Sequence, residues 1–137
     1  ILYSMAHWIK ENVTIDEYNL YTHIESLNIV NIPHIIDYNI ENNSLITEKI
    51  PNMSISNYYG EKFSDIPIRV AQGIRAIIKK LYDNGVYYND ITGYNFIEWH
   101  DEIWIVDVEH ASLDKTACEP FIEKFINGHN GWNPLYI

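Results

Sequence analysis

The sequence predicts an α+β fold in a single domain of 137 residues. Two observations predict it. Apolar residues recur at helical spacing in two long segments, and short apolar runs around these segments are separated by turn-forming residues. The resulting order is strand, helix, two strands, helix, two strands and a short helix, which is an α+β pattern. A chain of this length can bury one core of modest size.

The chain is expected to begin with a strand and a helix. Residues 1–10, ILYSMAHWIK, are typical of an apolar strand that ends in a lysine. Residues 14–27, TIDEYNLYTHIESL, carry apolar side chains near helical spacing. Thr14 or Asp16 is expected to cap this helix, because a short side-chain oxygen can accept from the free amides of the first turn.

A hairpin and a connection are predicted next. The runs HIIDYNI (34–40) and LITEKI (45–50) flank ENNS, whose residues favour a tight turn, so the two runs are expected to pair. The following PNMSISNYYG (51–60) predicts a connection that contains a short helical turn.

The longest predicted helix comes after this connection. Ser64 or Asp65 is expected to cap it, with Pro67 in its first turn, and Gly85 is expected to stop it. Gly73 lies inside the helix, where it costs about 1 kcal/mol relative to alanine, and so indicates close packing at that point. The predicted core face comprises Ile66, Val70, Ile74, Ile77, Ile78 and Leu81.

Two strands and a short helix complete the prediction. NFIEW (95–99) and IWIVDV (103–108) are expected to pair around the turn HDE. EPFIEKFING (119–128) predicts a short helix, with Pro120 at its start and Gly128 beyond its end.

The charge and composition exclude some partners. The net charge of −10, with no basic stripe to offset it, argues against nucleic-acid binding. The only arginines are Arg69 and Arg75. A bound anion must therefore be held by lysine, by backbone amides or through a cation.

A reducing, cytoplasmic location is expected. Cys118 is the only cysteine, so no disulfide can form within the chain. No apolar run approaches the roughly 18 residues that a membrane span needs, and the first residues lack a basic signal region. The sequence does not begin with methionine, which suggests a fragment.

Three polar residues stand out in VYYNDITGYNFIEWHDEIWIVDVEHAS (86–112). Asp90 and Asn95 follow the long helix, and Asp107 ends the last predicted strand, which the hairpin would bring back beside Asn95. A carboxylate and an amide oxygen that meet in this way can share a hard cation such as Mg²⁺. A second carboxylate nearby can orient or deprotonate a hydroxyl. These are the parts that phosphoryl transfer needs, because its catalysis is mainly positioning and charge neutralisation.

At these residues the sequence resembles the protein-kinase-like superfamily. NDITGYN is similar to its catalytic loop, IVDVE to its metal-binding strand end, and IPIRVAQGIRAIIKKLYDNGVYYND to the helix before that loop. Upstream, AHWIK is similar to the third-strand lysine motif, and SLITEKIPNMSISNYYG to the fifth strand, the hinge and the first large-lobe helix. The resemblance runs from about residue 5 to residue 110.

The resemblance implies ATP and Mg²⁺ as cofactors. Asp90 matches the catalytic base, and Asn95 and Asp107 match the metal ligands. Lys10 matches the lysine that contacts the α- and β-phosphates of ATP.

It also implies an ion-pair partner for that lysine and an adenine pocket. Glu17 matches the partner, and Glu25 is the alternative, because the spacing between the lysine and Glu17 is shorter than usual. Thr47 matches the gatekeeper beside adenine, and the backbone of Glu48 and Ile50 matches the hinge that hydrogen-bonds it.

The sequence departs from the family pattern in the catalytic loop and the metal-binding motif. Tyr88 and Asn89 stand where the loop usually has histidine and arginine, so control by a phosphorylated activation loop is not expected. Val108 and Glu109 follow the metal-binding aspartate where the family usually has phenylalanine and glycine. This favours small-molecule, viral-type or atypical kinases over ordinary protein kinases.

Other family parts are short or absent. No glycine-rich loop precedes Lys10, and only 30 residues follow Asp107. We therefore expect a reduced protein-kinase-like fold in one domain. Residues 1–50 would form a partial small lobe, and residues 51–137 the hinge and a truncated large lobe. A partner protein could complete that lobe.

Each residue also has a structural interpretation that stays open. Asp90 and Asn95 are common turn formers. Lys10 fits a solvated strand end, and Glu17 fits an exposed helix face. Asp107 is harder to explain in this way, because a lone carboxylate at the end of an apolar run is costly.

The sequence thus predicts a phosphotransferase that moves the γ-phosphate of ATP to a hydroxyl of a protein or a small molecule. The alternative is a non-catalytic pseudokinase or partner-binding scaffold with the same fold. A metal-dependent nuclease or phosphatase is a third class, but the negative charge argues against the nuclease, and the hairpin favours the kinase-like interpretation.

Overall fold

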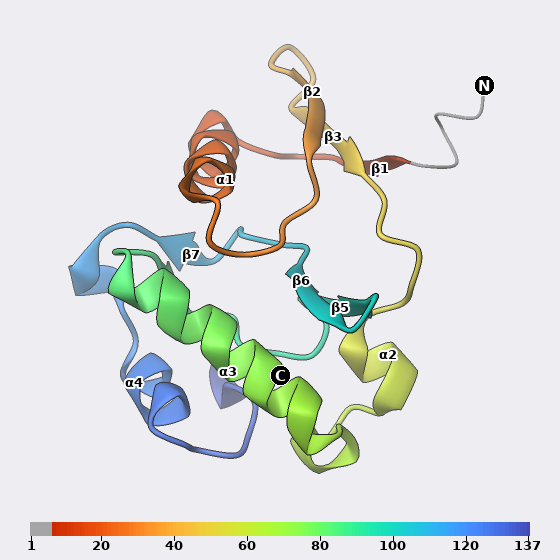
Figure 1. Ribbon diagram of the computed structural model, residues 1–137. Coiled ribbons are helices and arrows are strands. Elements are labelled where there is room, and N and C mark those ends of the chain that lie inside the picture. Colours follow the sequence, from red (N-terminus) through yellow and green to blue (C-terminus); the bar gives the residue numbers. More distant parts are fainter. Residues whose placement is uncertain (1–6) are drawn as a thin grey trace.

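The computed structural model describes residues 7–137. The chain forms small antiparallel sheets and four α-helices in this range, which confirms the predicted α+β class. Figure 1 shows the first sheet and helix α1 at one end, and helices α3 and α4 at the other. The strand predicted for residues 1–10 is present as β1, His7–Lys10, and residues 1–6 lie outside the described part.

The first half of the chain forms a three-stranded sheet and one helix. Strand β1 pairs with β3 (Ser44–Glu48), and β3 pairs with β2 (Ile35–Asn39), in the antiparallel order β1-β3-β2. The predicted hairpin is confirmed. Helix α1 (Ile15–Leu27) connects β1 to β2, and the side chain of Thr14 caps it, as one of the two predicted caps.

The middle of the chain forms helices α2 (Ile55–Tyr59) and α3 (Ile68–Asp83). The predicted cap of α3 is wrong. Ser64 and Asp65 lie in a separate 3₁₀ turn, where the Asp65 carboxylate accepts from the Lys62 amide, and Pro67 takes the cap position without a side-chain hydrogen bond. Ile66 is buried but lies between that turn and the helix.

The end of α3 and its packing follow the prediction. Gly85 has a φ of +76°, a left-handed conformation that suits glycine after a helix end. A Cβ on Gly73 would lie 2.9 Å from Cγ1 of Ile103, so helix and strand approach closely there. The buried face of α3 comprises Val70, Ala71, Ile74, Ile77, Ile78 and Leu81. Each fully buried isoleucine contributes about 2 kcal/mol.

The second predicted hairpin consists of β5 (Phe96–Trp99) and β6 (Glu102–Ile105). Both turn residues, His100 and Asp101, have positive φ, which is the geometry of a tight two-residue hairpin turn. Both strands are shorter than predicted. Asn95 comes just before β5, and Asp107 lies beyond the end of β6. Both residues are therefore in loops.

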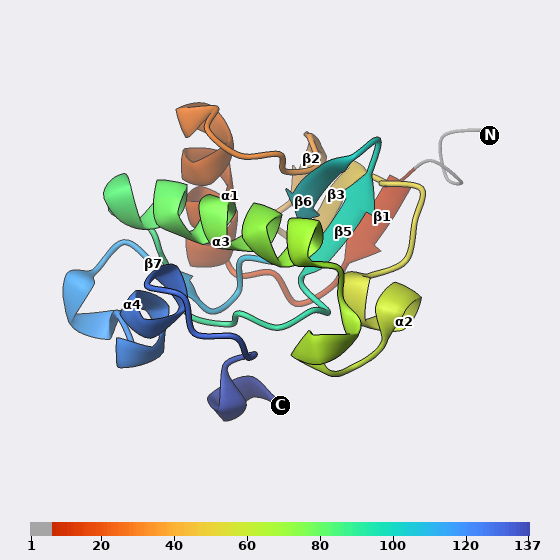
Figure 2. The same ribbon diagram turned by 60° about the horizontal axis from the view of Figure 1, so that its bottom comes forward.

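The last elements cover the far side of α3. The short predicted helix is α4, Pro120–Ile126, and its Ile122 and Phe125 are fully buried. Figure 2 shows α3 between α4 on one side and α1 with the β5–β6 hairpin on the other. An unpredicted pair of two-residue strands, β4 (Tyr87–Tyr88) and β7 (Ala111–Ser112), joins the end of α3 to the segment after β6.

None of the helices within residues 7–137 is both long enough and apolar enough to cross a membrane.

Candidate functional site

Lys10 lies at the centre of a cluster of carboxylates. Its Nζ is 2.7 Å from Oε2 of Glu17, 3.2 Å from Oδ1 of Asp107 and 3.7 Å from Oε1 of Glu109. These three acids come from the first turn of α1 and from the loop after β6. The fold therefore brings Lys10 and Asp107 together across 97 residues of sequence.

The charges around Lys10 change its pKa. Burial by itself would lower the pKa of the ammonium group, but the hydrogen bond to Glu17 and the attraction of Asp107 and Glu17 outweigh it and raise the pKa above its ordinary value. Lys10 is thus protonated at neutral pH. It serves as a positive charge in the cluster and not as a base.

Local structure fixes the position of Glu17. The Oγ1 of Thr14 accepts a hydrogen bond from the Glu17 amide at 3.1 Å, so the residue that starts α1 also orients the glutamate toward the end of β1. The Glu17 side chain is only 9% exposed, so its ion pair is the most buried of the three contacts that Lys10 makes with carboxylates. Glu25 instead pairs with His34 at 2.9 Å and does not contact Lys10.

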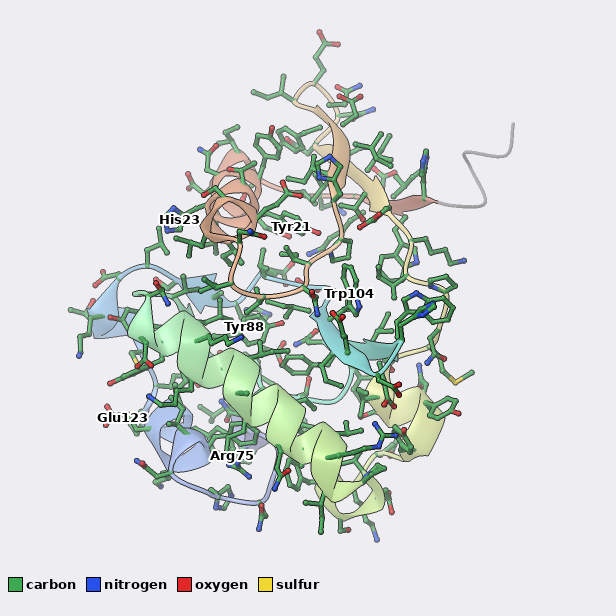
Figure 3. All side chains as sticks on the ribbon, viewed as in Figure 1. Tyr21, His23, Arg75, Tyr88, Trp104 and Glu123 are labelled. Atoms are coloured by element: carbon green, nitrogen blue, oxygen red, sulfur yellow. The ribbon has the colours of Figure 1, made fainter. Side chains whose placement is uncertain are left out.

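A cavity of about 320 Å³ opens beside Lys10, between the first sheet and the loop after β6. Its walls are mostly apolar, with Thr47 from β3 on one side and Val106 to Val108 on another. Tyr21 extends from α1 toward the strands, as Figure 3 shows, and its hydroxyl donates to the Pro33 carbonyl at 2.5 Å. An apolar cavity with a few charged groups at one end is the usual form of a small-molecule site.

The predicted hinge residues, Glu48 and Ile50, do not line this cavity. The Glu48 amide donates to the His34 carbonyl, and the Glu48 carbonyl accepts from the Thr47 hydroxyl. Ile50 is buried, and its carbonyl accepts from the Asn52 amide. The contacts of Glu48 and Ile50 with adenine stay a prediction.

The loop between β4 and β5 holds Asp90 and Asn95 in one hydrogen-bonded unit. The Asn95 Nδ2 donates to the Asp90 carbonyl at 2.8 Å, and the Thr92 hydroxyl donates to Oδ1 of Asp90 at 3.1 Å. The amide of Val106 donates to the Asn95 carbonyl, so the residue just before Asp107 is tied to Asn95. The predicted approach of these loops is therefore present in the backbone.

Asp107 and Asn95 each have one side-chain oxygen without a hydrogen bond in the described part of the chain. Oδ1 of Asp107 accepts from Lys10 and from the Glu109 amide, while no hydrogen bond to Oδ2 of Asp107 or to Oδ1 of Asn95 is found within residues 7–137. No group of three or more His, Cys, Asp or Glu side chains in the described range could hold a metal by itself. Mg²⁺ is usually held by one or two carboxylates together with phosphate oxygens and water, so Asp107 is the residue here whose chemistry could take part in such a site.

Two residues at the positions that depart from the family pattern have structural roles that sequence reasoning missed. The Tyr88 hydroxyl donates to the Asp107 carbonyl, and Tyr88 lies beside α3 in Figure 3. Burial and the negative charges of Asp107 and Asp90 raise the pKa of Tyr88 well above its ordinary value, so it stays a donor. The only feature of the sequence that could have indicated this role is the pair of tyrosines, Tyr87 and Tyr88, before Asp90.

Asn89 anchors the C-terminal segment to the loop between β4 and β5. Its Nδ2 donates to the Ala117 carbonyl at 3.0 Å, and its Oδ1 accepts from the Glu119 amide at 3.0 Å. Its own carbonyl accepts from the side chain of Asn133 at 2.7 Å. The neutral side chain of Asn89, hydrogen-bonded to main-chain groups, thus stands where the catalytic loop of the resembled family usually has an arginine.

No protein-family model matches the chain, and no curated protein matches it.

Proposed function

We propose that the chain is an ATP- and Mg²⁺-dependent phosphotransferase with a reduced protein-kinase-like fold. The observation that carries the proposal is the position of Lys10, which lines a cavity and contacts Glu17 and Asp107 there at 2.7 and 3.2 Å. In protein kinases the strand lysine must pair with a helix glutamate while the metal-binding aspartate is in place. The same three residue types meet here.

The order of the elements supports this fold. The strand with the lysine pairs with β3, which leads into the segment predicted as the hinge, and the helix with the glutamate follows the lysine strand directly. The loop with Asp90 and Asn95 lies between the long helix α3 and the β5–β6 hairpin. This is the sequence of parts that the resemblance implies from the lysine strand to the metal-binding aspartate.

Each residue of the cluster has a chemical task in the proposed reaction. Lys10 donates hydrogen bonds to the α- and β-phosphates, and Glu17 holds the ammonium group in position. Asp107 and Asn95 would hold the metal ion, which when bound would supply positive charge to neutralise the phosphates.

Asp90 acts on the acceptor. Its carboxylate takes the proton of the acceptor hydroxyl while the hydroxyl oxygen bonds to the γ-phosphorus and the bond from that phosphorus to the β-phosphate oxygen breaks. The products are ADP and a phosphate ester. Thr92 donates to Oδ1 of Asp90 and so orients the carboxylate.

The nucleotide base is assigned to the cavity beside Thr47. The cavity has a volume of about 320 Å³ and apolar walls that include Leu45 and Val108. The backbone of Glu48 and Ile50 follows the Thr47 strand, where the resemblance assigns hydrogen bonds to adenine.

Titration calorimetry of ATP with and without Mg²⁺ tests the proposal. Wild-type protein is expected to bind ATP in a Mg²⁺-dependent way, Asp107→Asn to lose that dependence, and Asp90→Asn to bind ATP without transferring phosphate. Asp101→Asn is the matched control, because Asp101 is exposed at the hairpin tip in a left-handed conformation that asparagine also adopts. Unchanged phosphate transfer by Asp90→Asn would contradict the mechanism.

A non-catalytic scaffold is the second candidate. It is favoured by one observation in the sequence, since none of residues 1–59 is a glycine and the given residues before Lys10 therefore contain no glycine-rich phosphate loop. Absence of ATP binding by a folded wild-type protein under every condition would support this candidate, and a search for a protein partner that completes the large lobe would follow.

A further inference from the structure

A second cavity lies next to the catalytic loop. It has a volume of about 290 Å³ and shares no lining residue with the cavity beside Lys10. Its walls come from α2, from the segment after α2, from the loop between Asp90 and Asn95, and from the last residues of the chain. The proposed function does not use it for the nucleotide.

The lining of this cavity is aromatic and acidic. Tyr94, Trp132 and Tyr136 supply rings, and Glu61 supplies the only acidic side chain. No Lys, Arg or His among residues 7–137 lines it. Aromatic faces and a carboxylate without a nearby base attract an organic cation, through the ring quadrupoles and the negative charge.

Glu61 holds two of these rings in place. Its Oε1 accepts from the Tyr94 hydroxyl at 3.0 Å, and its main-chain carbonyl accepts from Nε1 of Trp132 at 3.0 Å. No hydrogen bond to Oε2 of Glu61 is found in the described part of the chain, so this oxygen is available to a ligand. The arrangement is thus set before any ligand arrives, which lowers the cost of binding.

Asp90 lies close to this cavity. Thr92 lines the cavity, and its hydroxyl donates to Oδ1 of Asp90 at 3.1 Å. Burial, the hydrogen bond to Glu119 and the charges of Glu119 and Asp90 raise the pKa of Tyr136, another wall residue. Because Thr92 both lines the cavity and donates to Asp90, a ligand in the cavity would lie one side chain away from the proposed base.

Gly93 lines the cavity at a point where a side chain has no room. A Cβ at this position would lie 2.1 Å from Oγ of Ser56 and 3.0 Å from the Trp132 ring. Ser56 also lines the cavity and is buried, and its Oγ has no hydrogen-bond partner within the described residues. The volume is at the lower end of the range for ligand pockets, which indicates a small ligand.

We propose that this cavity is the acceptor site, and that it binds the ammonium group of a small hydroxyl-bearing organic cation such as an amino alcohol. Glu61 pairs with the ammonium group, the rings of Tyr94 and Tyr136 face it, and the hydroxyl extends toward Asp90. The role as phosphate acceptor rests on the proposed function, whereas the binding of the cation does not.

Binding of choline to the chain without nucleotide tests the site. The matched ligand is the neutral carbon isostere, in which a tert-butyl group replaces the trimethylammonium group. Titration followed by NMR is expected to show saturable choline binding, with the isostere weaker by about tenfold, which is the size of one charge-assisted contact. Equal affinity for the two ligands would overturn the proposal.

Variants locate the binding. Glu61→Gln is expected to weaken choline binding by about tenfold, and Tyr94→Leu to weaken it measurably through loss of the aromatic face. Both residues are exposed, so both variants are expected to fold. Glu41→Gln, in the exposed turn after β2, makes the same change of charge far from the cavity and is expected to bind like wild type. Wild-type affinity in Glu61→Gln would refute the site.

Asp90→Asn separates this proposal from the proposed function. The variant is expected to retain saturable choline binding and to lose phosphate transfer. Choline binding without transfer from ATP by wild-type protein would support the cation site and refute the phosphotransferase. Transfer to other acceptors without choline binding would refute the cation site alone.

Discussion

The hydroxyl of Tyr88 donates a hydrogen bond to the main-chain carbonyl of Asp107. This bond joins the strand that leads into Asp90 to the loop that carries the metal-binding candidate. Together with the bond from the Val106 amide to the Asn95 carbonyl, it sets the spacing between the two loops of the site. The loops are therefore held together by the protein itself, before any ligand binds.

Tyr88→Phe is expected to separate these loops partly. The variant leaves the Asp107 carbonyl without its donor, which costs about 1–3 kcal/mol in the free energy of unfolding, and it should weaken Mg²⁺-dependent ATP binding. Urea denaturation and calorimetry measure the two effects. Tyr87→Phe is the matched control, because its ring packs against Tyr82 and no hydrogen bond from its hydroxyl is found in residues 7–137. An equal loss of ATP affinity in both variants would contradict the role of Tyr88.

Glu17→Gln is expected to weaken ATP binding by about tenfold, because it removes the charge that holds the Lys10 ammonium group. Glu25→Gln, on the same helix, is expected to leave the affinity unchanged, since Glu25 pairs with His34 instead. Titration calorimetry compares the two variants. The opposite ranking would assign the ion-pair role to Glu25.

Gly93→Ala is expected to destabilise the fold by about 1–3 kcal/mol through overpacking. The added methyl group would meet Oγ of Ser56 at 2.1 Å. Ser56→Ala alone should be close to neutral, because the lost hydroxyl has no partner in the described part of the chain. Combining the two should reduce the cost of the alanine, which a double-mutant cycle by urea denaturation detects. Simple additivity would show that the contact with Oγ is not the source of strain.

Glu98→Gln is expected to remove part of the acid sensitivity of the fold. Burial would raise the pKa of Glu98, but hydrogen bonds from Arg69 and Tyr59 outweigh it and lower the pKa below its ordinary value of 4.5. A lowered pKa in the folded state stabilises the protein above pH 4.5, and that contribution is lost as the pH falls through the folded-state value.

Urea denaturation of Glu98→Gln and wild type between pH 3 and pH 7 measures this effect as the difference between two curves. The free energy of unfolding of the wild type should exceed that of Glu98→Gln at neutral pH, and the two values should approach each other in acid. A constant difference over the whole range would show that the Glu98 charge does not contribute.

The sequence predicted the long elements well because their signals are local. The apolar residues of α3 repeat at helical spacing, and Val70, Ile74 and Leu81 are buried as that repeat requires. The turn ENNS and the stop at Gly85 were also recognised, since the backbone conformation at these points depends on the residues themselves. The cap of α3 was wrong, because Asp65 accepts from Lys62 in a separate turn.

The candidate site was predictable only in part. The spacing of Asp90, Asn95 and Asp107 predicted that their two loops approach, because a hairpin returns one strand end to the start of the other, and the bond from the Val106 amide to the Asn95 carbonyl joins them. The choice of Glu17 over the alternative on the same helix depends on the direction in which α1 leaves β1. That direction is set by packing and not by spacing.

The sequence by itself determined the α+β class, the main helices and hairpins, and the set of polar residues between Asp90 and Asp107. Only the tertiary structure decided which distant residues meet. It brought Lys10 to Asp107 over 97 residues, and it turned Asn89 toward Glu119 and the C-terminal segment. The physical reason is that helix and turn propensities act over a few residues, whereas such contacts form only when the whole core packs and every buried polar group finds a partner.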